Sequence, residues 1–135
     1  MDYRKKVILI TGASSGIGQA TAIALSHYEN TLVITARRQE LLDKTAGLIR
    51  NNNSRCLAIA GDALAEGHAE SVVNRAVELY GRIDIAILNV GSGPPSNTLT
   101  TPNETIISCM RTNYESMINF FCPLIRQMKQ RTHHQ

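Results

Sequence analysis

A run of branched apolar residues leads directly into a glycine-rich turn near the start of the chain. The run covers residues 6–10, and the turn covers residues 11–18 with the sequence TGASSGIG. An apolar run without polar alternation is typical of a strand buried on both faces of a parallel sheet. Apolar residues at helical spacing begin at Gly16. A chain that starts as strand, tight turn and helix is most consistent with the α/β class.

The strand-then-helix unit repeats along the chain. Further strands are predicted from apolar runs at residues 32–34, 56–59 and 83–88. Helices are predicted at residues 41–49 and 72–79, with a long helix at 103–130. Connections of this kind require right-handed crossovers. We therefore expect an α/β, Rossmann-like, doubly wound parallel sheet of four strands in the order 3-2-1-4, with a ligand at their carboxyl ends.

Size and composition predict one domain and exclude several partners. The 135 residues, 43% of them hydrophobic, suffice for one core, so residues 1–130 form the predicted nucleotide-binding domain and residues 131–135 a polar tail. The net charge is +3 with scattered basic residues, which does not suggest nucleic-acid binding. No apolar run approaches the roughly 18 residues that a membrane span needs. We expect no membrane partner and a cytoplasmic location.

The cysteines and histidines show no metal-binding pattern. The three cysteines are Cys56, Cys109 and Cys122, which are widely spaced and lack a C-x-x-C pair. The four histidines also lack ligand spacing, and His27 and His68 fall in predicted helical regions as ordinary polar residues. We predict no metal site and no disulfide framework.

The glycine-rich turn is suited to phosphate. Glycines allow backbone angles closed to other residues, and the free N–H groups at the start of a helix attract negative charge. The spacing G-x-x-x-G-x-G differs from the commoner dinucleotide fingerprint G-x-G-x-x-G, although the mechanism is the same. The alternative is a tight turn that binds nothing. The position of the turn directly after the first buried strand favours a bound diphosphate.

The turn resembles that of the short-chain dehydrogenase/reductase family, whose motif T-G-x-x-x-G-I-G is matched at every fixed position. The resemblance covers essentially the whole chain. It continues at Gly61-Asp62, Asp84, Asn89-Val90-Gly91 and Asn113. It implies that Asp62 contacts the adenine and that residues 89–91 support the cofactor beside the fourth strand. Val90 replaces the family's alanine and adds bulk near the cofactor ribose.

The predicted cofactor-binding residues come from the first turn and from the ends of the next three strands. They are Thr11, Gly12, Ser14, Ser15, Gly16, Ile17, Gly18, Arg37, Arg38, Asp62, Ala63, Asn89, Val90 and Gly91. Two of them have ordinary alternative uses. Asn89 is also a common turn residue, and Asp62 a common helix cap.

The end of the second strand predicts NADP rather than NAD. An acidic residue about 20 positions after the glycine turn would bind the adenosine ribose of NAD. Ala36 stands where NAD-selective family members have aspartate, and the next residue, Arg37, offers a planar cation to the 2′-phosphate of NADP. For Arg38, phosphate binding and simple solvation of the following helix remain equally open.

Only one of the family's catalytic positions has a counterpart. Asn113 matches the asparagine that helps to hold a water in the proton relay, with Ser116 where the family often has glycine. A lone asparagine on a helix also serves as polar surface. No Tyr-x-x-x-Lys occurs, so the general acid that protonates the developing alkoxide is absent. In the family these residues follow the long helix, so we expect a truncated chain that is inactive alone.

We therefore expect an NADP(H)-dependent oxidoreductase, represented by its cofactor half, that acts on a small carbonyl or alcohol. The alternative is a non-catalytic nucleotide-binding or self-associating module. The long helix has an unusually wide apolar surface. We expect most of it to pack on the chain's own sheet and the rest to mediate homo-oligomer formation. Its apolar residues are Ile106, Ile107, Met110, Tyr114, Met117, Ile118, Phe121, Leu124, Ile125 and Met128.

Overall fold

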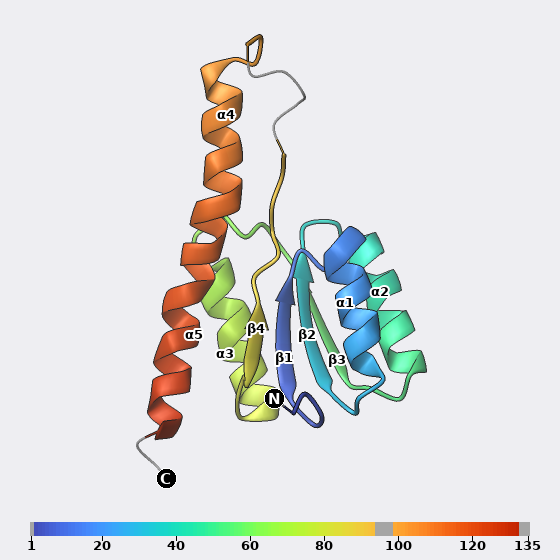
Figure 1. Cartoon of the computed structure of the whole chain (residues 1–135). Coiled ribbons are helices and arrows are strands. Elements are labelled where there is room, and N and C mark those ends of the chain that lie inside the picture. Colours follow the sequence, from blue (N-terminus) through green and yellow to red (C-terminus); the bar gives the residue numbers. More distant parts are fainter. Residues whose placement is uncertain (1, 94–98, 133–135) are drawn as a thin grey trace.

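A parallel sheet forms the centre of the molecule in the computed structural model, which describes residues 2–93 and 99–132 (Figure 1). The described strands are β1 (Val7–Thr11), β2 (Thr31–Ala36), β3 (Cys56–Ala60) and β4 (Ile85–Ile87). They lie in the order β3-β2-β1-β4, which confirms the predicted order. The helices are α1 (Gly16–Ser26), α2 (Gln39–Asn51), α3 (His68–Tyr80), α4 (Asn103–Met110) and α5 (Ser116–Thr132), with a π-helical turn η1 (Arg111–Glu115) before α5.

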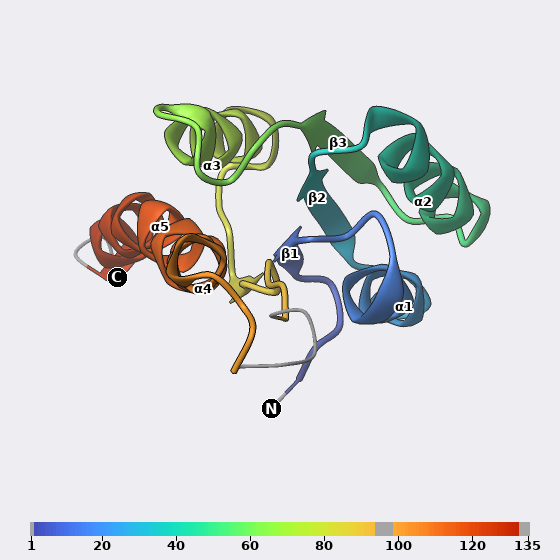
Figure 2. The same cartoon turned by 90° about the horizontal axis from the view of Figure 1, so that it is seen from above.

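Helices cover both faces of the sheet (Figure 2). Alternate residues of a strand point to opposite faces, so each strand contributes to two cores. The buried apolar strand residues are Ile8, Ile10, Leu32, Ile34, Ala36 and Cys56 in the core with α1 and α2, and Val7, Leu9 and Val33 in the core with α3 and α5. This is why the strands read as continuous apolar runs in the sequence.

Strand β4 is shorter than the predicted residues 83–88. The side-chain amide of Gln127 on α5 bonds to both backbone groups of Ile83, accepting from its N–H at 3.3 Å and donating to its carbonyl at 3.0 Å. At the other end, the N–H of Asn89 donates to Oγ1 of Thr11 at 2.9 Å. Side chains thus replace strand pairing at both ends, and β4 forms one edge of the described sheet.

The predicted long helix is interrupted by the π-helical turn η1. The hydroxyl of Ser116 donates to the carbonyl of Thr112, and the Ser116 side chain is buried. A hydroxyl that bonds back into the preceding turn competes with the regular helical ladder and favours a local change of winding. Helix α5 then continues to Thr132, two residues beyond the predicted end. Residues 94–97 of the predicted loop and residues 133–135 of the predicted tail lie outside the described residues.

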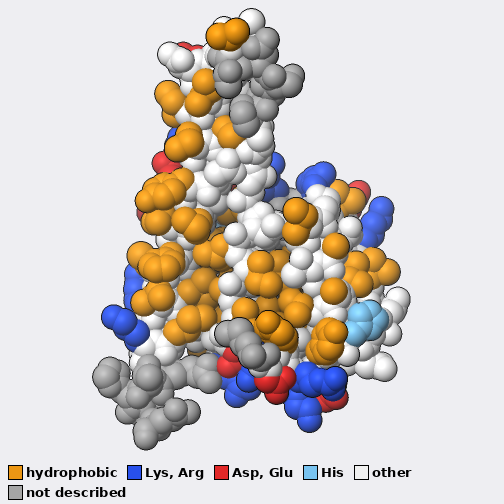
Figure 3. All heavy atoms as spheres, viewed as in Figure 1, with side chains coloured by type: hydrophobic (Ala, Val, Ile, Leu, Met, Phe, Trp, Pro, Cys, Tyr) orange, Lys and Arg blue, Asp and Glu red, His pale blue; other side chains and the backbone are white. Residues whose placement is uncertain are grey.

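The apolar surface of α4, η1 and α5 is mostly exposed, which contradicts our expectation that the sheet buries most of it (Figure 3). Leu124 is buried, but the helix extends past the sheet, so α4 has no sheet beneath it (Figure 1). The exposed side chains are Ile106, Ile107, Met110, Tyr114, Met117, Ile118, Phe121 and Ile125. In residues 2–93 and 99–132, no helix is both long and apolar enough to cross a membrane.

Asn30 ties the start of β1 to the end of α1. Its side chain is 1% exposed. Oδ1 accepts from the N–H of Lys6 at 2.9 Å, and Nδ2 donates to the carbonyl of Leu25 at 2.9 Å. Without this side chain, both backbone groups would need new partners in a partly buried place.

Replacing Asn30 with alanine is expected to lower the free energy of unfolding by about 2–4 kcal/mol, because two partly buried backbone groups lose their partners. Urea unfolding followed by circular dichroism measures the change. Asn51→Ala at the exposed end of α2 is the matched control and should change stability by less than about 0.5 kcal/mol. Equal stability of the two variants would contradict the role assigned to Asn30.

Candidate functional site

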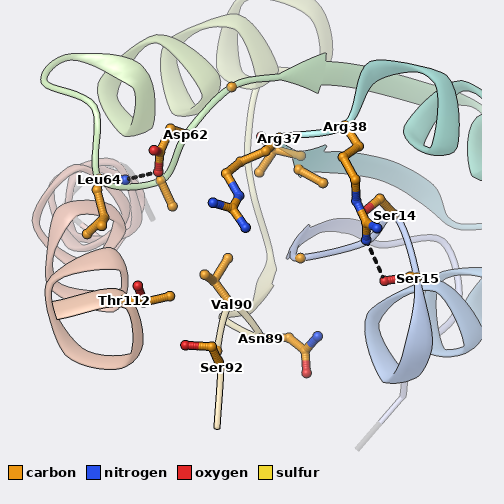
Figure 4. A pocket seen from close by; sticks show the side chains of 16 residues that line it. Ser14, Ser15, Arg37, Arg38, Asp62, Leu64, Asn89, Val90, Ser92 and Thr112 are labelled. Atoms are coloured by element: carbon orange, nitrogen blue, oxygen red, sulfur yellow. Dashed lines mark hydrogen bonds between the residues drawn. The ribbon is translucent and has the colours of Figure 1, made fainter. Parts of the chain in front are cut away.

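A cavity of about 410 Å³ opens at the carboxyl ends of the strands. Open α/β sheets bind their ligands in this position. Its walls come from the segments that follow each strand and from the π-helical turn (Figure 4). The lining residues are Gly12, Ser14, Ser15, Thr35, Ala36, Arg37, Arg38, Gly61, Asp62, Ala63, Leu64, Asn89, Val90, Gly91, Ser92 and Thr112.

Most of the predicted cofactor residues line this cavity. Those outside the lining are Thr11, Gly16, Ile17 and Gly18 of the first turn, together with the predicted catalytic residue Asn113. The lining also includes residues beyond the predicted set, namely Thr35, Ala36, Gly61, Leu64, Ser92 and Thr112. Each of these lies within two positions of a predicted site residue. These residues could have been predicted from their position in the sequence, either just after a strand or beside Asn113.

The first turn has the geometry of an anion cradle. Gly12 and Gly16 have φ angles of +66° and +57°, a backbone conformation that other residues rarely adopt. Ser15 precedes α1 and makes no side-chain capping bond within the described part of the chain. The first N–H groups of a helix have no partner inside the helix, so those of α1 are available to an anion.

Close packing holds the first turn against the segment after β4. A Cβ atom on Gly18 would lie 2.2 Å from the Gly12 carbonyl oxygen and 2.8 Å from Nδ2 of Asn89. A Cβ atom on Gly12 would lie 3.0 Å from the Asn89 carbonyl oxygen. Both glycines are therefore required by close approach, and Thr11 and Gly18 support the cavity from behind rather than lining it.

Arg37 and Arg38 have different surroundings, although they are neighbours in sequence. Figure 4 shows the side chain of Arg37 extending into the cavity, whereas Arg38 reaches toward the first turn. Nη2 of Arg38 donates to Oγ of Ser15 at 3.0 Å and approaches Oγ of Ser14 at 3.4 Å. Among the described residues, none forms an ion pair with Arg37. The Arg37 charge is therefore directed at whatever occupies the cavity.

Asp62 begins the far wall of the cavity. Its Oδ1 accepts from the N–H of Leu64 at 2.9 Å, and its backbone carbonyl accepts from the N–H of Ala65 at 2.9 Å. These bonds close a tight turn rather than cap a helix. The carboxylate itself is exposed at the cavity. Its second oxygen can still accept a hydrogen bond from a ligand.

Asn113 fastens the π-helical turn to the segment after β4. Its Oδ1 accepts from the N–H of Ser92 at 2.7 Å, and its Nδ2 donates to the Ser92 carbonyl at 2.8 Å. A Cβ atom on Gly91 would lie 2.8 Å from Oδ1 of Asn113, so the glycine permits this approach. Asn113 thus fixes the backbone of a cavity wall, while Thr112 beside it lines the cavity.

Metal-binding groups are not gathered in the described ranges. Residues 2–93 and 99–132 contain no cluster of three or more histidine, cysteine or acidic side chains that could hold an ion. The described cysteines are all free thiols. The polar side chains that line the cavity carry hydroxyls, two guanidinium groups, one carboxamide and one carboxylate.

Comparison with known proteins identifies the family of the chain. The family model described as short chain dehydrogenase matches residues 6–134. The chain belongs to the short-chain dehydrogenase family, and this family binds nicotinamide cofactors. An uncharacterized oxidoreductase of Listeria monocytogenes is 35% identical over 119 residues, which cover 88% of this chain and 45% of that protein. The chain thus spans about half the length of the curated relatives that it resembles.

Solved structures show the same fold. An actinorhodin polyketide ketoreductase with NADPH superposes with a TM-score of 0.87 at 25% identity, covering 96% of this chain and 51% of that one. An NAD+-bound xylitol dehydrogenase superposes with a TM-score of 0.90 at 23% identity, covering 97% of this chain and 51% of that one. The Rossmann-like architecture is therefore shared with both.

Replacing Gly18 with alanine is expected to weaken dinucleotide binding at least tenfold and to lower the free energy of unfolding by about 1–3 kcal/mol. The reason is that the new methyl group would overlap the carbonyl of Gly12. Urea unfolding and isothermal titration with NADP measure the two effects.

Gly47→Ala is the matched control for that substitution. Gly47 lies inside α2, and a Cβ atom there meets nothing within 4 Å. Alanine at this position should stabilise the protein by about 0.5–1 kcal/mol and leave binding unchanged. The close-packing account fails if the two alanine variants behave alike.

Proposed function

We propose that this chain is the cofactor-binding half of an NADP(H)-dependent oxidoreductase that interconverts a small carbonyl compound and its alcohol. The observation that carries the proposal is the Arg37 side chain, which extends into the cavity beside the glycine-rich turn (Figure 4). A dinucleotide laid across the strand ends would place its diphosphate at residues 12–18. Its adenosine ribose would then lie near Arg37.

The choice of NADP over NAD rests on the groups at the end of β2. A carboxylate there would accept a hydrogen bond from the 2′-hydroxyl of NAD and would repel the 2′-phosphate of NADP. This chain has Ala36 at that position, followed by Arg37. The guanidinium of Arg38 already donates a hydrogen bond to Ser15. We therefore assign the phosphate contact to Arg37 and a supporting role in the turn to Arg38. The ketoreductase neighbour contains NADPH, which is in keeping with this choice.

The residues of the chain would bind and orient the cofactor. Amides at the start of α1 hold the diphosphate, and Asp62 accepts hydrogen bonds from the adenine end. Asn113 keeps the Ser92 backbone in place near the nicotinamide end. When bound, the nicotinamide supplies or accepts the hydride. Val90 and Thr112 line the cavity, and we place them beside the nicotinamide.

Proton transfer needs groups that this sequence does not contain. A carbonyl that receives hydride requires a donor with a lowered pKa beside the new alkoxide, and the chain has no Tyr-x-x-x-Lys. We therefore propose that this chain binds cofactor but does not complete the reaction alone. Its free cysteines favour a reducing compartment, and we propose the cytoplasm.

Self-association is a second proposed property, and it also supports the alternative of a non-catalytic interaction module. The outer face of α4, η1 and α5 presents a continuous row of apolar side chains along one side of the molecule (Figure 3). Exposed apolar surface of this extent is typical of a protein interface. We propose that a second copy of the chain covers it.

The cofactor proposal predicts that the chain binds NADP at least tenfold more tightly than NAD. Arg37→Gln should weaken NADP binding about 10- to 100-fold, because a charge-assisted contact to phosphate is lost, and should leave NAD binding nearly unchanged. Titration calorimetry with each dinucleotide measures both affinities.

Arg75→Gln on the exposed side of α3 provides the control, since Arg75 does not line the cavity. It should bind both dinucleotides as the unmodified chain does. Tighter binding of NAD than of NADP by the unmodified chain would refute the assignment. An equal loss of affinity for both dinucleotides in Arg37→Gln would refute it too.

The association proposal predicts concentration-dependent sedimentation that Phe121→Asp abolishes. Phe121 is 53% exposed on α5, and Leu79, on α3, is 56% exposed. Leu79→Asp is thus a matched change on another surface and should still associate. A single monomeric species of the unmodified chain at high concentration would contradict the proposal.

A further inference from the structure

The adenine-side wall of the cavity is a loop with few supports of its own. This segment, residues 61–67, which we call the β3 loop, contributes Gly61, Asp62, Ala63 and Leu64 to the lining. Apart from the short bonds inside the loop, its backbone is joined to the sheet by the N–H of Gly61, which donates to the Ala36 carbonyl at 3.0 Å. Side chains from other elements therefore have a large share in setting its shape.

The first of these side chains is Asn119 on α5. Its Nδ2 donates to the carbonyl of Ala63 at 2.9 Å, across 56 positions of sequence. The next residue, Phe120, is 1% exposed and belongs to the same buried cluster as Ala63. Pro123 follows four positions after Asn119 and has no backbone N–H, so α5 continues through this point without the hydrogen bond that residue 123 would donate to the Asn119 carbonyl. One hydrogen bond from the Asn119 side chain thus fixes the middle of the β3 loop to a helix outside the cavity.

The second side chain is His68 at the start of α3. Its Nε2 lies 2.9 Å from Oγ1 of Thr35 in a hydrogen bond, and its ring meets Phe120 edge-on at 6.3 Å between centroids. The ring also lies against Gly61, where a Cβ atom would come within 2.2 Å of it. Burial lowers the pKa of His68 below its ordinary value, although the charge of Asp62 opposes part of that shift. The imidazole therefore joins the end of β2, the start of the β3 loop and α5.

We propose that Asn119 and His68 are positioning residues that hold the β3 loop in the shape that receives the adenosine end of the dinucleotide. Neither residue is part of the cavity lining, so each acts through the loop: Asn119 through Ala63 and His68 through Gly61. The inference rests on the proposed function for the identity of the ligand. The contacts that hold the loop do not depend on it.

The test uses Asn119→Asp, which keeps the size of the side chain and removes the donor, and His68→Phe, which keeps the ring and removes the bond to Thr35. Affinities are measured for NADP and for 2′-phospho-ADP-ribose, which lacks the nicotinamide. Each variant should bind both ligands about five- to tenfold more weakly, because one hydrogen bond that shapes the adenosine subsite is lost. The factor should be the same for both ligands, since the nicotinamide end is unchanged.

Hydrogen exchange of the ligand-free chain gives a second readout. In both variants the amides of residues 61–67 should exchange faster, while those of β1 and β2 keep their protection. Asn74→Asp and His27→Phe make the same chemical changes at exposed positions outside the cavity lining and should alter neither measurement. Should Asn119→Asp fail to fold, Asn119→Ala removes the donor without adding charge.

Two outcomes would overturn the inference. One is unchanged exchange of the β3 loop in folded variants. The other is loss of NADP affinity without loss of affinity for 2′-phospho-ADP-ribose. If the unmodified chain binds neither ligand, the proposed function is wrong, and the exchange measurement still decides whether Asn119 and His68 hold the loop.

Discussion

The contact between the first glycine turn and the segment after β4 determines the position of the rest of the site. Gly12, Gly18 and Asn89 approach more closely than side chains at the two glycines would allow. This contact sets the start of α1 next to the end of β4, and the N–H of Asn89 completes it by donating to the Thr11 hydroxyl. The amides at the helix start and the wall at residues 89–92 are consequently held together.

Polar side chains hold the remaining walls by bonding to backbone rather than to one another. Asn113 holds Ser92, Asn119 holds Ala63, and Gln127 holds Ile83. All three lie on the π-helical turn or on α5, so this stretch of helix supports both the cavity and the edge strand. These side-chain amides bond to backbone groups. Their support of the walls therefore depends on the path of the backbone and not on the side chains that line the cavity.

The sheet and the first turn could be predicted from the sequence because their signals are local. Short apolar runs mark strands, and the glycine spacing of residues 12–18 marks the turn whatever the rest of the chain does. The same reasoning found Arg37, because its distance from the turn is fixed by the strand-helix-strand unit.

Contacts between distant residues limited the prediction elsewhere. The ends of β4 depend on Gln127, which lies 44 positions from Ile83. The π-helical turn depends on how Ser116 and Asn113 use their side chains, and helical periodicity alone predicts one uninterrupted helix. The sequence predicts an ordinary polar residue at His68, because nothing in its neighbourhood in sequence reveals the Thr35 and Gly61 contacts. Helical periodicity also does not reveal that α4 lies beyond the sheet (Figure 1), so the sequence predicts more burial of the apolar face than the structure shows.

The placement of Asn113 and Asn119 on successive turns of one helical stretch has a thermodynamic consequence. The opposite face of that stretch carries the exposed apolar side chains, so a partner that shifts the helix also shifts both walls of the cavity. Linkage is reciprocal: if docking on the outer face changes the dissociation constant of a nucleotide by some factor, nucleotide changes the strength of docking by the same factor. Docking on the outer face and nucleotide binding in the cavity would then be coupled through this helix.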